Sequence, residues 1–135
     1  MRIIAIDYGS KRTGLAWTDP MQIIATGIGS FDTPLIEAKL KELVAKESVE
    51  TIVLGYPTRL DGSDTHITAA VREFEIKLKT WFPAVQVLRW DERFTSKEAS
   101  RAILEGGAKK KKRQDKHLVN EVAATLLLQD YMQYR

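Results

Sequence analysis

The sequence predicts an α/β protein with a mixed β-sheet, an initial three-stranded meander and helices on both faces of the sheet. Two patterns lead to this fold class. Strand-like segments at residues 2–7, 13–18 and 22–31 come first, with only short turns between them. Helix-like and strand-like patterns then alternate along the chain, which indicates helices packed against a sheet. The length of 135 residues matches one domain over residues 1–135.

Each strand of the meander follows from its residue pattern. Residues 2–7 (RIIAID) are an apolar run before Tyr8-Gly9-Ser10, as expected of a buried strand that ends in a turn. Residues 13–18 (TGLAWT) alternate and are expected to pair back as a hairpin. Asp19-Pro20 marks the turn before the third strand.

The central part of the chain alternates between helix and strand. Thr33-Pro34 has the form of an N-cap followed by proline at the first helical position, and it begins a helix that runs to about Lys46. Residues 51–54 (TIVL) are β-branched and apolar, which indicates a central strand. A helix from about Thr65 to Thr80 and a strand over 85–90 complete this part.

The last part of the chain is predicted to be helical. Thr95 and Glu98 form a capping box for a short helix that ends at about Leu104. Residues 108–114 form a basic loop. The final helix runs to about Tyr131, and its apolar positions are Leu118, Val119, Val122, Leu126 and Leu127.

The composition excludes several classes of site and location. The chain has no cysteine, which excludes disulfides, thiolate metal sites and cysteine nucleophiles. Its two histidines exclude a His-rich zinc site. The apolar run at the N-terminus is too short for a signal sequence or a membrane span. We therefore expect a soluble, cytoplasmic protein without a membrane partner.

Positive charge is concentrated in one segment. Between Glu105 and His117, six basic residues stand against the acids Glu105 and Asp115, a local charge of +4 compared with +3 for the whole chain. This concentration favours a polyanionic partner, with phosphate contacts that position the substrate without reading its sequence. The alternative is a solvated surface loop.

Carboxylates end two of the predicted strands. Asp7 ends the first, and Asp91 and Glu92 end the strand over 85–90. Adjacent strand residues point to opposite faces, so only one of Asp91 and Glu92 can share the face of Asp7. Oxygen ligands of this kind suit Mg²⁺ or Mn²⁺, and two such ions can activate water at a phosphodiester. The alternative is an Asp7 that caps a turn and an acidic surface turn at 91–92.

The first turn also carries cations. Gly9 and Gly14 flank Lys11 and Arg12, and the missing side chains are expected to leave room for a phosphate backbone.

Four motifs together resemble the YqgF/RuvX family, Holliday-junction-resolvase-like proteins regarded as nucleases of pre-16S ribosomal RNA. They are IAIDYGSKRTGLA at 4–16, IVLGYPTRLDGS at 52–63, DERFTS at 91–96 and LVNEVAATLLLQDY at 118–131. They occur in the family's order and cover nearly the whole chain. The first motif alone is less specific, because actin-like ATPases and sugar kinases use a similar turn for phosphate.

The resemblance implies a ribonuclease H-like fold and a catalytic, metal-binding site at Asp7, Glu92 and position 120. Position 120 is Asn in this chain, where the family pattern has Asp. The site therefore lacks one negative charge, and divalent metal binding is expected to weaken. Three explanations stay open: the site works with one metal or a weaker second one, Asp115 substitutes, or nucleic-acid binding is kept and most catalysis lost. Glu121 turning into the site is a further alternative.

The resemblance implies a Mg²⁺- or Mn²⁺-dependent endonuclease of structured RNA that matures the 5′ end of pre-16S rRNA. The alternatives are a non-catalytic nucleic-acid-binding protein, a Holliday-junction-type resolvase of branched DNA, and an actin-like ATPase, which the chain length disfavours. The oligomeric state, monomer or dimer, stays open. The residues expected to hold nucleic acid are Lys11, Arg12, Arg93, Lys109, Lys110, Lys111, Lys112 and Arg113.

Overall fold

The computed structural model describes residues 1–56, 67–91 and 116–135. Its elements are β1 (Arg2–Asp7), β2 (Arg12–Thr18), β3 (Ala25–Asp32), a 3₁₀ turn η1 (Thr33–Leu35), α1 (Ile36–Lys46), β4 (Val49–Tyr56), α2 (Thr68–Trp81), β5 (Gln86–Asp91) and α5 (Lys116–Tyr134). The helix predicted from Thr95 to Leu104 and the basic loop at 108–114 lie outside the described residues.

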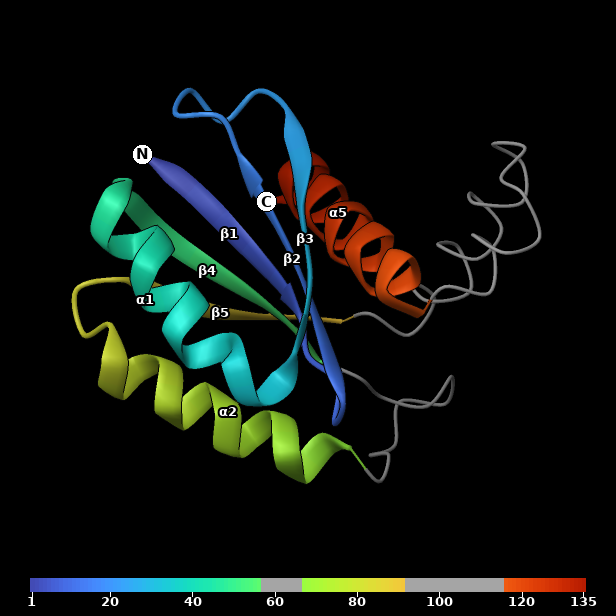
Figure 1. Cartoon of the computed structure of the whole chain (residues 1–135). Coiled ribbons are helices and arrows are strands. Elements are labelled where there is room, and N and C mark those ends of the chain that lie inside the picture. The colour runs from blue at the N-terminus through green and yellow to red at the C-terminus, as the bar shows by residue number, and fades with distance from the viewer. Residues whose placement is uncertain (57–66, 92–115) are drawn as a thin grey trace.

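The strands form one mixed sheet in the order β3-β2-β1-β4-β5 (Figure 1). The strands β1, β2 and β3 pair antiparallel, as the predicted meander requires. The strands β4 and β5 run parallel to β1, each reached through a helix. The predicted mixed sheet is therefore confirmed, and the parallel strands β1, β4 and β5 end at the same edge.

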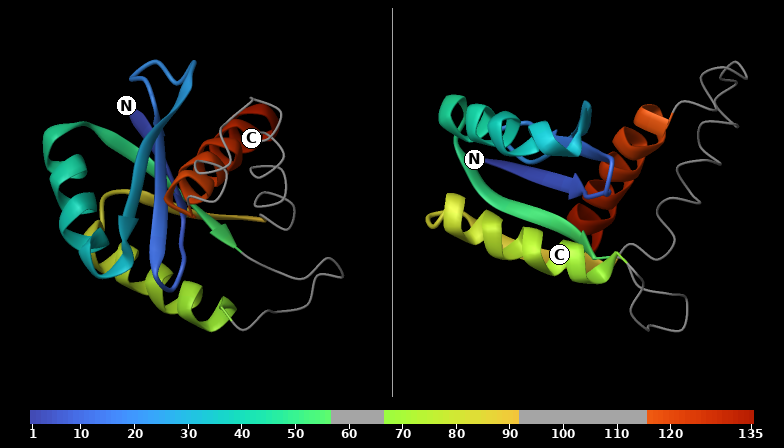
Figure 2. Two further views of the ribbon diagram at one scale, coloured as in Figure 1. Left: turned by 45° about the vertical axis from the view of Figure 1, so that its right-hand side comes forward. Right: turned by 60° about the horizontal axis from the view of Figure 1, so that its bottom comes forward.

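Helices cover both faces of the sheet. Figure 2 shows α1 and α2 on one side and α5 on the other. The larger core lies under α1 and α2, where Ile4, Ile6 and Ile52 are fully buried. The smaller core lies under α5 and includes Ala5 and Val53. Apolar side chains of β1 thus point alternately to the two faces, which explains its nearly continuous apolar sequence. Among the described helices, none is long and apolar enough to cross a membrane.

The third strand begins three residues later than its sequence predicts. Asp19 organises the preceding turn, because its carboxylate accepts backbone N–H hydrogen bonds from Met21, Ile23 and Ile24 at 2.7–3.1 Å. These bonds hold the pKa of Asp19 below its usual value, chiefly through the bond from Ile24. Gln22 adopts a left-handed conformation with φ of 58°. The apolar residues Ile23 and Ile24 therefore belong to an exposed turn.

The final helix contacts the sheet through smaller residues than predicted. Its fully buried positions are Ala123, Ala124, Leu127 and Leu128, whereas Leu118, Val119, Val122 and Leu126 are only partly buried. The predicted set was correct for Leu127. Two of the four buried residues are alanines, which allows the helix to lie close to the sheet, as the glycine contacts below show.

A buried acid joins α2 to β5. Arg89 Nε donates to both carboxylate oxygens of Glu75 at 3.0 Å, and its Nη2 donates to Oε1 at 2.7 Å. These bonds hold the pKa of Glu75 below its usual value and outweigh the opposing effect of burial. The forked geometry fixes the position of α2 along the sheet.

Replacing Glu75 with Gln should reduce stability at neutral pH but not in acid. A carboxylate with a lowered folded-state pKa stabilises the protein above its ordinary value of 4.5, and this contribution is lost as the pH falls through the lower folded value. The expected loss at pH 7 is about 1 kcal/mol, since Arg89 is half exposed and solvent screens the pair. Thermal melts at pH 7 and pH 3 test this. Glu73→Gln, at an exposed position of α2, is the control. An equal loss of stability in both variants would show that the loss does not come from the pair of Glu75 with Arg89.

Candidate active site

The site candidate lies where the parallel strands end. Figure 1 shows the carboxyl ends of β1, β4 and β5 on the same side of the molecule as the first turns of α2 and α5. Asp7 is the last residue of β1 and is only 9% exposed. Its neighbours Ile4 and Ile6 face α1 and α2, and Ile3 and Ala5 face α5. Asp7 therefore lies on the α5 face of the sheet.

Asn120 comes to the same place from the other end of the chain. Gly14 is the register partner of Asp7 on β2. A methyl group on Gly14 would overlap the backbone carbonyl group of Asn120 and lie 2.9 Å from the backbone nitrogen of Glu121. The glycine thus lets α5 lie directly on β2, and this brings Asn120 beside the end of β1.

The space at Gly9 and Gly14 is occupied by protein. A side chain at Gly9 would overlap the carbonyl group of Arg12, and one at Gly14 would overlap Asn120. The expectation that both glycines leave room for a phosphate backbone is therefore wrong. Gly9 allows the backbone of the turn to approach the Arg12 carbonyl group, and Gly14 allows α5 to contact β2.

The turn between β1 and β2 is held from both sides. From α5, Asn120 Nδ2 donates to the Arg12 carbonyl oxygen at 3.0 Å. From the other side, Thr33 Oγ1 donates to the Gly9 carbonyl oxygen at 2.6 Å, and Thr33 N–H donates to the Lys11 carbonyl oxygen at 2.9 Å. Asp7 therefore leads into a turn whose backbone is fixed.

Thr33 differs from its predicted role. Its side chain makes no capping hydrogen bond at the start of the helix, since the residue at the N-cap of η1 is Asp32. Its hydroxyl instead contacts the turn and lies 2.9 Å from the Thr13 hydroxyl. The local pattern around Thr33 gives no sign of this contact, because Gly9 is 24 positions away.

Asp91, the described member of the acidic pair at the end of β5, lies on the face opposite to Asp7. Val87 and Arg89 face α2, as the core contacts and the Glu75 ion pair show, whereas Trp90 packs with Tyr131 of α5. Asp91 follows the alternation of Arg89 and lies on the α2 face, opposite to Asp7. Asp91 and Asp7 therefore do not converge. Glu92 lies outside the described residues.

Glu121, the described one of the two other acids considered near position 120, lies away from Asp7. Glu121 lies over β3, where its Oε1 would be 2.8 Å from a methyl group on Gly27. The strand β2 separates β3 from β1, so this carboxylate is two strands away from Asp7. Asp115 lies outside the described residues.

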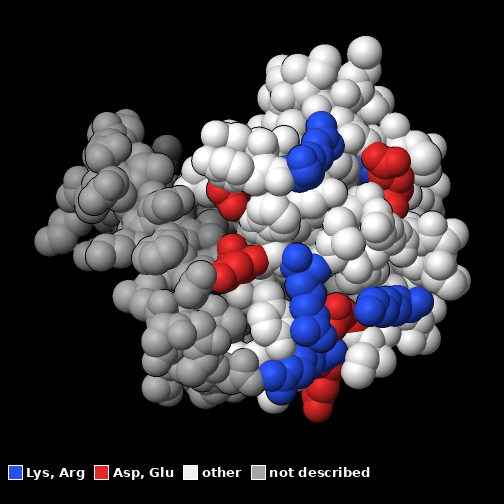
Figure 3. Space-filling model, turned by 180° about the vertical axis from the view of Figure 1, so that it is seen from behind, with Lys and Arg blue, Asp and Glu red and all other residues white. Residues whose placement is uncertain are grey.

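The described cations near the site are Lys11 and Arg12. Lys11 is exposed, and Arg12 is half buried. The Arg12 Nε is buried and has no hydrogen-bond partner among the described residues, which is costly for a guanidinium unless an anion or water satisfies it. The remaining predicted nucleic-acid contacts, Arg93, Lys109, Lys110, Lys111, Lys112 and Arg113, lie outside the described residues. On the face shown in Figure 3, described basic and acidic side chains are interspersed and form no uniform field.

The donor atoms at the site suit a hard cation. The described residues contain no group of three or more His, Asp and Glu side chains that could hold a metal ion. They do bring together one carboxylate, from Asp7, and one amide, from Asn120. Because Asn120 Nδ2 donates to Arg12, its Oδ1 is the atom that stays available as a ligand. Oxygen donors alone are the ligands that Mg²⁺ and Mn²⁺ prefer.

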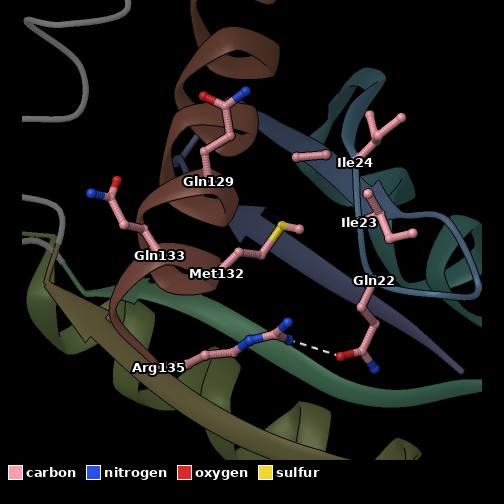
Figure 4. Close-up of a pocket in the computed structure, with 8 residues that line it drawn as sticks. Gln22, Ile23, Ile24, Gln129, Met132, Gln133 and Arg135 are labelled. Atoms are coloured by element: carbon pink, nitrogen blue, oxygen red, sulfur yellow. Dashed lines mark hydrogen bonds between the residues drawn. The ribbon is translucent and has the colours of Figure 1, made fainter.

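A second hollow lies at the opposite end of the sheet (Figure 4). It has a volume of about 510 Å³ and lies between the β2–β3 turn and the last turns of α5. Arg135 Nη1 donates to Gln22 Oε1 across it at 2.8 Å. Its lining consists of amide, aliphatic, thioether and arginine side chains, with no acidic side chain that could act in acid–base chemistry.

Comparisons with known proteins agree with the fold. A family model described as "RuvX: Holliday junction resolvase" matches residues 1–134. A protein of Flavobacterium psychrophilum is 46% identical over 131 residues, covering 97% of this chain and 96% of its own length. One of Porphyromonas gingivalis is 47% identical over 131 residues, covering 97% and 95%. Both carry the name "Putative pre-16S rRNA nuclease".

The solved structures show the same architecture at low identity. Thermus thermophilus RuvC in complex with a Holliday junction substrate matches with a TM-score of 0.58 and 16% identity, covering 99% of this chain and 97% of RuvC. A second Thermus thermophilus RuvC structure matches with a TM-score of 0.56 and 14% identity, covering 98% and 97%. This likeness confirms the predicted ribonuclease H-like fold.

Proposed function

Because the chain belongs to the RuvX family of Holliday junction resolvases, we propose that it is a divalent-metal-dependent nuclease of structured RNA. We further propose that residues 1–135 act as one nuclease domain and that the substrate is the 5′-extended precursor of 16S rRNA. The substrate assignment rests on the names of the relatives. The chemical assignment rests on Asp7, a nearly buried carboxylate at the carboxyl end of a central strand, held next to an amide from α5.

In this proposal Asp7 and the Oδ1 atom of Asn120 bind the metal, and Glu92 supplies the remaining carboxylate. Asp91 lies on the opposite face, which leaves Glu92 as the member of the pair able to share the face of Asp7. A bound Mg²⁺ or Mn²⁺ would activate water and offset charge on the phosphate. With Asn at position 120 the ligand set carries two negative charges, which favours one bound ion over two.

The protein's own contribution is orientation. The hydrogen bonds from Asn120 and Thr33 fix the carbonyl groups of the turn that follows Asp7, so the carboxylate is held in place before substrate binds. The half-buried Arg12 would contact a substrate phosphate through its guanidinium group. Lys11, and the predicted contacts Arg93 and Lys109–Arg113, would add phosphate contacts that depend on salt.

The direct test is cleavage of a 5′-extended 16S precursor fragment by the full chain, with Mn²⁺, Mg²⁺ or EDTA. A four-way DNA junction is assayed in parallel. Metal-dependent cleavage of the RNA alone supports the proposal, and cleavage of the junction alone supports a resolvase. Salt-sensitive RNA binding without cleavage under any metal supports the non-catalytic alternative and overturns the proposal.

Replacing Asn120 with Asp should lower stability without metal and increase the response to metal. Asp has no N–H to donate to the Arg12 carbonyl oxygen and places a carboxylate against it, which should cost about 1–3 kcal/mol. The added charge should strengthen Mn²⁺ binding, and a ligand that binds the folded state raises the melting temperature. Melting curves in EDTA and in Mn²⁺ separate the two effects.

The matched control is Asn120→Ala, which loses the same hydrogen bond without adding charge. It should be destabilised in EDTA and gain no more from Mn²⁺ than the native chain does. Equal Mn²⁺ responses of Asn120→Asp and Asn120→Ala would remove position 120 from the metal site.

A further inference from the structure

We propose that the pocket between α1, α2 and the β1–β2 turn binds one unpaired nucleobase of the RNA substrate. The inference rests on the proposed function and deepens it, since it names the feature of the RNA substrate that the protein would recognise, an unpaired nucleotide. The pocket lies on the α1 and α2 face of the sheet, opposite to Asp7 but at the same edge. The lining residues that bear on binding are Tyr8, Ser10, Glu37, Phe74, Lys77 and Trp81.

The pocket has the size and surface for one base. Its volume of about 240 Å³ is below the roughly 300–1,000 Å³ of pockets for drug-sized ligands. Two partly exposed aromatic side chains, Tyr8 and Trp81, line it and pack against the buried Phe74, their ring centroids lying 4.5 Å and 5.9 Å from that of Phe74. Aromatic surfaces bind bases by stacking with little dependence on sequence.

Polar groups line the same pocket and fit the rest of a nucleotide. Lys77 is exposed and has no ion pair among the described residues, so its ammonium group is available for a phosphate. Glu37 is paired with Lys41 at 2.7 Å, which offsets its repulsion of a phosphate. Ser10 is exposed and can donate or accept a hydrogen bond at a base edge or a ribose hydroxyl.

The position relative to Asp7 gives the pocket its role. Tyr8 directly follows Asp7, and their side chains lie on opposite faces of the sheet at the same edge. An RNA strand that crosses the β1–β2 turn can place a phosphate at Asp7 and a neighbouring base in the pocket. A base can reach the pocket only if it is unpaired. The pocket would therefore select RNA with a bulge or single-stranded nucleotide next to the cleavage site.

The test is metal-free binding, which keeps recognition separate from cleavage. Two RNA hairpins, one with a single 2-aminopurine bulge and one fully paired, are titrated with the full chain in EDTA. We expect the bulged RNA to bind roughly fivefold more tightly or better, since one stacked base contributes at least this much. The 2-aminopurine fluorescence should be quenched on binding.

Two variants and one control locate the effect. Trp81→Leu should abolish the preference and the quenching, and Lys77→Gln should weaken binding of the bulged RNA more than of the paired RNA. Lys79→Gln, on α2 but outside the pocket and paired with Glu75, should keep the native preference.

Equal affinity of the native chain for both RNAs, or an equal effect of Lys77→Gln and Lys79→Gln, would overturn the inference. Cleavage without a bulge preference would refute the pocket alone, whereas a bulge preference without metal-dependent cleavage would refute the nuclease alone.

Discussion

Asp7→Asn should abolish metal-dependent cleavage and the response of the chain to Mn²⁺. The substitution removes the negative charge proposed to bind the cation and changes the volume of the side chain hardly at all. We expect cleavage to fall by at least about a hundredfold, because even side chains that only support a metal ligand typically contribute 10- to 100-fold. Initial rates on the precursor RNA at saturating Mn²⁺ measure the loss.

The response of stability to metal is the second readout. A ligand that binds only the folded state raises the melting temperature, so Mn²⁺ should stabilise the native chain, and this stabilisation should disappear in the Asp7→Asn variant. A purely structural role for Asp7 would give a different result, a lower melting temperature in EDTA together with an unchanged response to Mn²⁺.

Asp32→Asn is the matched control. Asp32 is exposed and is the last residue of β3. It is the register partner of Arg12, so it lies at the same edge of the sheet as Asp7. It should keep native cleavage and the native response to Mn²⁺, since its side chain lies two strands away from Asp7. Equal cleavage by Asp7→Asn, Asp32→Asn and the native chain would exclude Asp7 from catalysis.

The fold could be predicted from the sequence because its signals are local. The apolar run of β1, the alternation of β2 and the β-branched run of β4 each specify a strand without reference to distant residues. The start of β3 could not be predicted in the same way. Its apolar residues Ile23 and Ile24 fit a strand pattern, but the three backbone hydrogen bonds to Asp19 place them in a turn.

The candidate site was predictable in part. A carboxylate at the end of an apolar strand is visible in the sequence, and the structure places Asp7 there. The contact of Asn120 with the Arg12 carbonyl group joins residues 108 positions apart, and no local pattern carries that information. The same holds for Thr33, whose sequence context predicts a helix cap, and for the contact of α5 with Gly14. The role of Glu92 stays a prediction, because that residue lies outside the described part.

Gly14→Ala should cause a large loss of stability, well above that of Gly27→Ala. The new methyl group would overlap the backbone of Asn120, and backbone cannot rotate away as a side chain can. The helix α5 would have to lift from the sheet, exposing part of the core formed by Ala124, Leu127 and Leu128. We expect a loss of about 3 kcal/mol or more in the free energy of unfolding, at or above the usual range for overpacking. Urea unfolding measures it.

Gly27→Ala separates this contact from the general effect of replacing a glycine in a strand. Gly27 also faces α5, but the nearest atoms to its added methyl group would be those of the Glu121 side chain, with Oε1 at 2.8 Å and Cγ at 2.9 Å. This side chain can turn toward solvent. Neither glycine has a positive φ, so backbone strain is the same small term in both variants. Gly27→Ala should therefore change stability by less than about 1 kcal/mol.

Cleavage rates of the two variants give a second comparison. If Gly14→Ala cleaves RNA much more slowly than the native chain and Gly27→Ala does not, then activity depends on the position of Asn120 on the sheet and not on the presence of α5 alone. Equal stability of the two variants would mean that α5 does not lie on β2 as closely as the Gly14 contact requires.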